Sequence, residues 1–238
     1  MGFACEDIAN AAVWYHRSVA EDLEELARRL ARAVTGHVDG VLKVFLPLVE
    51  SRGEHRIACG DGCSACCANF VRCSVPEALV VAEWLDDPAH ADVRARFVAK
   101  LPGWRARAGN DPTRIEAHLA RHGGSGDAVE WDAYQKMAVA YARKQNLCAF
   151  NDDQGRCDIY EVRPLICRSV YVLETADNCV PDRAPPQIVS HPALEEAFRE
   201  ATHRCAEAAA RIGRDPEPHA IPEAVARALG LPGLTPMS

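Results

Sequence analysis

The sequence predicts a mainly α-helical fold, a helical domain with a small β-hairpin and a cysteine-rich core. Apolar residues recur at helical spacing along most of the chain. A strand-like pattern is confined to one short stretch, residues 147–160. Four cysteines lie within nine residues, from Cys59 to Cys67. Together these observations predict helices that surround a centre organised by cysteines.

We expect one domain over residues 1–238, because a chain of this length is long enough for one substantial core. Within it, residues 55–185 would form the cysteine-cluster core. Helices in residues 1–52 and 190–238 would flank that core.

Two amphipathic stretches open the chain, at residues 21–34 and 38–49, and each carries its apolar residues on one face. Gly36 and Gly40 lie between them. This arrangement predicts either one kinked long helix or a helical hairpin.

The later helices are predicted from their start signals, which are a capping Asp or a proline at an early helical position. They are expected over residues 75–85, 87–101, 111 to the glycine-rich break at 123–126, 127–144, 193–212 and 222–229, with one short turn at 162–168.

The predicted hairpin joins Cys148–Phe150 to Cys157–Tyr160 through a turn-rich connection, residues 151–156. Such a hairpin would hold Cys148 and Cys157 close together, as in metal ribbons.

The cysteine cluster reads Cys59-Gly-Asp-Gly-Cys63-Ser-Ala-Cys66-Cys67, and almost nothing apolar lies between the thiols. Thiolates that converge from a glycine-rich loop are what zinc or an iron–sulfur cluster requires. Disulfides and inert buried thiols are the alternatives. We favour metal, because residues 1–20 show no secretory signal and a cytoplasmic chain keeps its thiols reduced.

Composition and charge argue against two classes of binding partner, membranes and nucleic acids. No apolar stretch approaches the roughly 20 residues of a membrane span, so no membrane partner is expected. The net charge of −7 argues against a general nucleic-acid binder. The locally basic residues 94–114 are interpreted as a solvated helix face rather than a phosphate-binding surface.

Four motifs follow one another along the chain: Cys-x3-Cys-x2-Cys-Cys, Cys-x-Phe, Gly-x-Cys-x-Ile-Tyr and Arg-Pro-x-x-Cys-Arg. In this order, over Cys59–Arg168, they resemble the CxxCxxCC (YkgJ-like) family, whose members are described as zinc- or iron-chelating. The resemblance implies eight metal-binding cysteines. Seven are Cys59, Cys63, Cys66, Cys67, Cys148, Cys157 and Cys167, and the eighth is Cys179, with Cys73 as a competing candidate.

Seven or eight thiolates exceed the four that one zinc ion or one cubane cluster uses, which leaves either two centres or one centre with spare thiols. Adjacent Cys66 and Cys67 would project in different directions from a helix. An iron–sulfur cluster is preferred over zinc, because the thiol number and the Cys-x3-Cys-x2-Cys spacing fit a cluster well. That spacing also occurs in radical S-adenosylmethionine enzymes, but no alternating strand–helix run follows it here.

Thiolate charge needs compensation, because four thiolates around a divalent metal leave a net charge of about −2. Arg168 follows Cys167 directly, Arg163 lies one turn earlier, and Tyr160 adds a hydroxyl donor. We interpret these three residues as an outer shell around the metal or cofactor. The alternatives are that they cap and pack the turn, or that Arg168 binds an anionic substrate or cofactor.

Two classes of function remain open at this point. The first is a metal-holding module. The second is a cluster-dependent modifying enzyme that transfers methyl groups, because the domain also resembles the cysteine-rich part of flagellin lysine methylases. His55 is a weaker ligand candidate; Cys5 is expected to be free, and His203 and Cys205 to have packing or surface roles.

Overall fold

The computed structural model describes residues 5–51, 56–60, 62–122, 127–183 and 186–231, with the backbone alone over 5–21. Within this part of the chain the fold is mainly α-helical, with one small antiparallel strand pair, as the sequence predicts.

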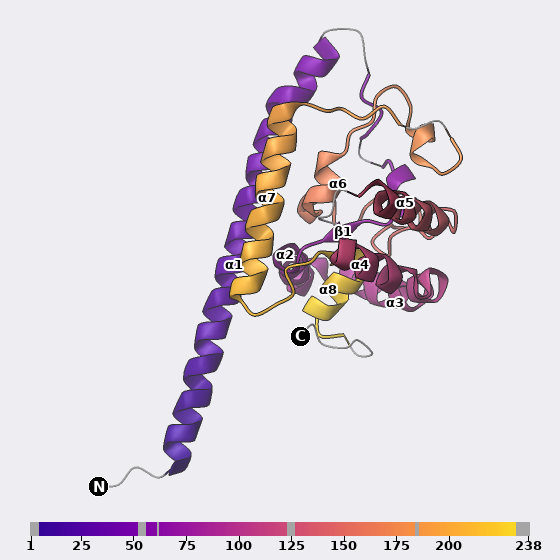
Figure 1. Cartoon of the computed structure of the whole chain (residues 1–238). Helices are drawn as coiled ribbons and strands as arrows, with labels where there is room; N and C mark the ends of the chain where they lie inside the picture. Colours follow the sequence, from indigo (N-terminus) through magenta and orange to yellow (C-terminus); the bar gives the residue numbers. More distant parts are fainter. Residues whose placement is uncertain (1–4, 52–55, 61, 123–126, 184–185, 232–238) are drawn as a thin grey trace.

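The first two amphipathic stretches form one continuous helix, α1 (Cys5–Ser51). Of the two arrangements predicted for this region, the long helix is therefore the one adopted. Helix α7 (Pro192–Arg211) lies beside α1 along much of its own length, and the N-terminal part of α1 extends beyond the other helices (Figure 1).

The contact between α1 and α7 has its own apolar core. Buried alanines on α7, Ala197 and Ala201, face buried residues of α1 such as Ala31 and Val38. Small side chains on both helices leave room for the backbones to approach. Leu165 also belongs to this core and connects it to the remainder of the fold.

The remaining elements pack around a second, larger core. Its helices are α2 (Val75–Asp86), α3 (Ala91–Ala108), α4 (Asp111–His122), α5 (Ala128–Ala142), α6 (Leu165–Ser169) and α8 (Ile221–Ala228). Short 3₁₀ turns occur at η1 (Ala65–Ala68), η2 (Pro88–His90), η3 (Tyr160–Val162) and η4 (Ala176–Cys179). Phe97 of α3 stacks on Phe150, with ring centroids 4.2 Å apart, and so connects this core to the Cys148 segment.

The strand pair is not where the sequence analysis placed it. Strands β1 (Arg72–Cys73) and β2 (His219–Ala220) pair antiparallel, and they come from distant parts of the chain. The hairpin predicted within residues 147–160 is reduced to one antiparallel bridge between Asn151 and Cys157. Extended pairing stops because a tight turn follows each cysteine of this segment, closed by hydrogen bonds from the Asn151 amide to the Cys148 carbonyl and from the Tyr160 amide to the Cys157 carbonyl.

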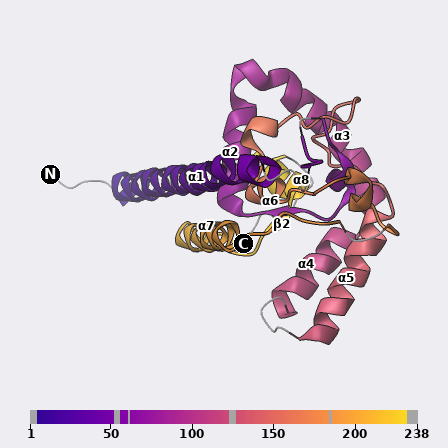
Figure 2. The ribbon, with the colours of Figure 1, turned by 90° about the horizontal axis from the view of Figure 1, so that it is seen from above.

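Among the residues that the structure describes, no helix is both long and apolar enough to cross a bilayer. Seen from above, α4 and α5 form an adjacent pair whose joined end lies at the edge of the molecule (Figure 2).

Candidate metal centre

The cysteines of the predicted centre come from segments far apart in the sequence, and all those in the described part of the chain are free thiols. Cys66 is exposed, and the other seven predicted ligands are half-buried. A set of thiols that is neither fully buried in a core nor fully exposed on the surface is accessible to a metal ion.

The segment that contains Cys59 pairs through its backbone with residues 172–173. The Ala58 amide donates to the Val172 carbonyl at 2.8 Å, and Ile57 forms a bridge with Leu173. In return the Val172 amide donates to Cys59 Sγ at 3.2 Å. An N–H directed at sulfur favours the thiolate form, which is the form that binds metal.

Cys148 and Cys157 are each followed by a tight turn. The Asn151 amide donates to the Cys148 carbonyl at 3.0 Å, and the Tyr160 amide donates to the Cys157 carbonyl at 3.2 Å. These turns direct the Phe150 and Ile159 amides at the sulfurs of Cys148 and Cys157. Two thiols thus share the same local geometry, a sulfur that accepts an amide N–H from two residues further along the chain.

Two contacts join the Cys148–Cys157 segment to the Cys63–Cys67 segment. The Cys148 amide donates to the Cys67 carbonyl at 2.9 Å. Gly155 has a φ of 80° and approaches Ser64 so closely that an added Cβ would lie 3.1 Å from its hydroxyl oxygen. Glycine is therefore required at this turn both by its conformation and by its neighbour.

Cys167 is positioned by a buried carboxylate, Glu77. One oxygen of Glu77 accepts the Leu165 amide at the start of α6, at 2.6 Å, and the other accepts the Ser74 amide at the start of α2, at 2.8 Å. Negative charge is favourable at helix N-termini, and here one side chain serves two of them. The position of Cys167 in α6 thereby depends on α2. The Ser74–Glu77 spacing is a capping-box signal that the sequence contains, but the link to α6 is not readable from it.

The structure places the two candidates for the eighth ligand differently. Cys179 lies in η4, which packs against the η1 turn of Cys66 and Cys67, and the Asn69 side-chain amide donates to the Cys179 carbonyl at 3.4 Å. Cys73 is buried at 2% exposure in the larger apolar core. Position and accessibility therefore favour Cys179.

The electrostatic neighbours of the thiols fall into two sets. Cys59 and Cys179 interact with Cys63 and Cys66, and Cys148, Cys157 and Cys167 also interact with Cys66. Cys66 belongs to both sets, and it also shares a hydrogen bond with Cys67. The side chains of Cys66 and Cys67 are thus hydrogen-bonded to each other, whereas the sequence predicts that they project in different directions.

Burial favours the protonated form of several of these thiols. It raises the pKa of Cys167 to about 12 and that of Cys179 to about 11. Burial also raises the pKa of Cys59 and Cys157, while the Arg163 guanidinium acts in the opposite direction on both thiols. Metal binding at neutral pH must therefore displace protons from these groups.

Arg163 is the cation of the thiol group. Its charge acts on Cys59, Cys66, Cys157 and Cys167, which span both sets. Its guanidinium carbon lies 3.9 Å from the centroid of the Tyr160 ring, and its Nε is buried without a hydrogen-bond partner among the described residues. A buried, unpaired donor beside several thiols is suited to bind a sulfur or a cluster atom.

Arg168 has other partners. Its nitrogens bind Asp39 Oδ2 at 2.7 Å, the Arg163 carbonyl at 2.6 Å and the Glu161 carbonyl. Arg168 thus connects the turn before α6 to α1, which corresponds to the capping role among the three interpretations of this residue. Tyr160 contributes its ring face to Arg163.

The number of thiols exceeds what one metal centre uses. One tetrahedral zinc ion, with Zn–S bonds of about 2.3 Å, takes four thiolates, and one cubane cluster also takes four. The eight free thiols of the predicted set therefore correspond either to two centres or to one centre with spare thiols.

The remaining candidates lie apart from the thiol group. Cys205 is buried in the core between α1 and α7, and His203 is exposed with Glu207 at 3.4 Å. His55 and the Cys5 side chain lie outside the described residues. Five residues of the basic stretch are paired with carboxylates: Arg96 with Asp92 and Asp158, Lys100 with Asp153, Arg105 with Glu223, Arg94 with Asp86 and Arg114 with Asp111. Arg107 donates to the Asn146 side-chain oxygen at 2.9 Å.

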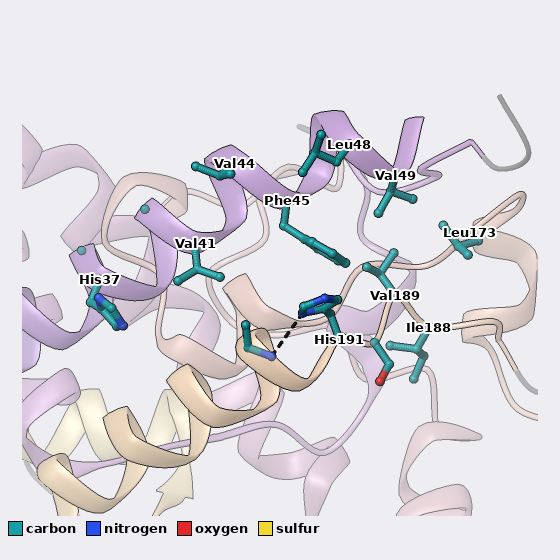
Figure 3. A pocket seen from close by; sticks show the side chains of 14 residues that line it. His37, Val41, Val44, Phe45, Leu48, Val49, Leu173, Ile188, Val189 and His191 are labelled. Atoms are coloured by element: carbon teal, nitrogen blue, oxygen red, sulfur yellow. Dashed lines mark hydrogen bonds between the residues drawn. The ribbon is translucent and has the colours of Figure 1, made fainter. Parts of the chain in front are cut away.

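The cavities are not centred on the thiols. An apolar groove of about 1120 Å³ lies between the C-terminal part of α1 and residues 188–193, and no cysteine lines it. Figure 3 shows Phe45 and His191 facing each other in this groove. Near the thiol group, a cavity of about 250 Å³ is lined by Arg163 and Arg168, and another of about 320 Å³ reaches Cys148.

Comparison of the chain with protein-family models, curated proteins and solved structures finds no match. The resemblance to the CxxCxxCC family therefore rests on the four motifs alone.

Proposed function

We propose that this chain is a metal-binding protein that holds an iron–sulfur cluster, or zinc as the less favoured metal, through its clustered cysteines. The main support for the proposal is that cysteines from distant segments lie close together. Cys179 is 120 residues from Cys59, and its η4 turn packs on the η1 turn of Cys66 and Cys67, whose Cys67 carbonyl accepts the Cys148 amide. Membership of the CxxCxxCC (YkgJ-like) family is part of the same proposal.

The surroundings of the sulfurs support metal over inert thiols. Cys59, Cys148 and Cys157 each accept a backbone amide, which favours thiolate. The unpaired Arg163 Nε supplies positive charge where thiolate charge would accumulate. A buried cysteine with only a packing role needs neither feature, as Cys205 in its apolar core illustrates.

The preference for a cluster rests on the number of thiols and on the Cys-x3-Cys-x2-Cys spacing, which fits a cluster well. Eight thiols are more than one zinc ion uses. A bound cluster would supply one-electron chemistry. We place the protein in the cytoplasm, where thiols stay reduced. The test is the iron, sulfide and zinc content of protein purified without oxygen.

The alternative proposal is a cluster-dependent methyl-transferring enzyme, which would need a cofactor cavity at the centre. The cavity beside Arg163, at about 250 Å³, is smaller than the roughly 300–1,000 Å³ of typical ligand sites, and the one at Cys148 is near their lower limit. We therefore prefer the metal-holding role.

Arg163→Ala is expected to weaken metal binding by about 10- to 100-fold, as losses in the outer shell of a metal typically do. It should also lower the reduction potential of a bound cluster, because removing a positive charge disfavours the added electron. Chelator competition and a redox titration measure the two effects. Arg163→Lys, which keeps the charge, should restore most of the potential.

Arg168→Ala is the matched control. Loss of the Arg168 side chain removes the pair with Asp39 and the bonds to the Arg163 and Glu161 carbonyls, so stability should fall by about 1–3 kcal/mol. Metal affinity and potential should change much less than in Arg163→Ala, because the charge of Arg163 remains. If Arg168→Ala weakens the metal and Arg163→Ala does not, the outer-shell role belongs to Arg168.

A further inference from the structure

Two histidines and a glutamate meet where α4 ends and α5 begins. His118 and His122 lie four residues apart on α4, so they share one face of the helix, and their ring centroids are 5.0 Å apart. Glu130 is in the first turn of α5. Its Oε2 lies 3.8 Å from His118 Nε2 and 3.7 Å from His122 Nε2. One ligand atom of each residue lies within 4.8 Å of the other two.

The group is held in place by the backbone around it. His118 is 9% exposed, and its Nε2 lies 2.9 Å from the Glu130 carbonyl oxygen. The start of α5 is fixed by Asp127, whose side chain accepts the Val129 amide at 2.7 Å. Ligating histidines commonly donate their second ring N–H to a carbonyl. Such a bond from Nε2 leaves the Nδ1 lone pair of His118 for a ligand.

We propose that His118, His122 and Glu130 form a metal site of their own, which binds zinc or a similar divalent transition-metal ion. Imidazole and carboxylate are donors that zinc accepts, and two histidines with one glutamate are a known set for sites that keep a fourth position for water. With bonds of about 2.0–2.2 Å, ligand atoms on tetrahedral zinc lie roughly 3.4 Å apart. The 3.7 Å between His122 Nε2 and Glu130 Oε2 needs to close by only a few tenths of an ångström.

This site is independent of the cysteine centre. Its donors come from α4 and α5, and none of them belongs to a cysteine segment. A bound ion would connect the last turn of α4 to the first turn of α5, at the joined end of that helix pair (Figure 2). Its chemistry is also different, since nitrogen and oxygen donors hold a redox-inactive ion without thiolate.

The test is zinc stoichiometry and affinity, measured on the full chain by equilibrium dialysis and chelator competition. The cysteines also take up zinc, so the informative quantity is the difference between variants. His122→Ala removes a half-buried ligand with little risk to the fold, and Glu130→Gln keeps the size of the third ligand while removing its charge. Each variant is expected to bind about one zinc equivalent fewer than the unchanged chain.

His203→Ala is the matched control, because His203 also lies beside a glutamate on a helix face but belongs to no group of three ligand atoms among the residues that the structure describes. It should keep the full zinc count. Equal zinc counts and affinities in the unchanged chain, His122→Ala and His203→Ala would show that the three residues form an ion pair only. The cysteine centre is unaffected by either outcome, because none of these variants changes a thiol.

Discussion

Removal of the metal, by a strong chelator or by Cys63→Ala together with Cys157→Ala, is expected to lower the melting temperature by about 8–16 °C. Metal present at about 1,000 times its dissociation constant stabilises the folded state by about 4 kcal/mol. In a chain of this size each kcal/mol corresponds to about 2–4 °C. Thermal unfolding followed by circular dichroism, with and without chelator, measures the change.

The physical reason lies in residues 56–69, where few apolar side chains are buried. Among the described residues 56–60 and 62–69, Ala68 alone is fully buried, and the order of these residues depends on short turns and on contacts with Val172 and Cys148. Hydrogen exchange in this segment should therefore accelerate more than in α2 when the metal is removed. Unchanged melting and exchange after chelation, in protein that held metal beforehand, would contradict a structural role for the metal.

Cys66→Ser is expected to cause the largest loss of metal among single substitutions. Cys66 interacts with both sets of thiols, so its replacement should weaken metal binding by the thiols of both sets. Cys179→Ser should lower the metal content less, because Cys179 interacts only with the set of Cys59, Cys63 and Cys66. Metal content per chain, after purification without oxygen, gives the ranking.

Cys5→Ser is the control for these variants, since Cys5 belongs to no cysteine motif, and it should leave the metal content unchanged. Cys73→Ala tests the eighth ligand: with Cys73 in the apolar core, stability should fall while the metal stays bound. Equal metal loss from Cys5→Ser and Cys66→Ser would show that the proposed ligand set is wrong.

Most helices are predictable from the sequence because their signals are local. Asp127 and Pro192 mark the starts of α5 and α7, and Ser74 with Glu77 forms the capping box of α2. The strand pair is not predictable from local sequence, because β1 and β2 are two residues long and meet through tertiary packing. Residues 147–160 contain strand-forming types, but the turns after Cys148 and Cys157 prevent a regular ladder.

The candidate site is predictable at the level of residue type, and its arrangement is not. Motif spacing identifies the cysteines, whereas the separate roles of Arg163 and Arg168 depend on Asp39, 129 residues from Arg168. The His118–His122 spacing is visible in the sequence, but Glu130 joins it only through the packing of α5 on α4. The arrangement of both sites therefore depends on contacts between segments that are distant in the sequence.

The most direct measurement of the central claim is the iron, sulfide and zinc content of the full chain purified without oxygen from iron-supplied cells, together with its visible spectrum. An iron–sulfur protein is expected, brown, with matching iron and sulfide and broad absorption near about 400 nm that fades in air. Zinc without sulfide would overturn the choice of metal. A colourless protein with neither iron nor zinc bound to its cysteines would contradict the metal centre itself.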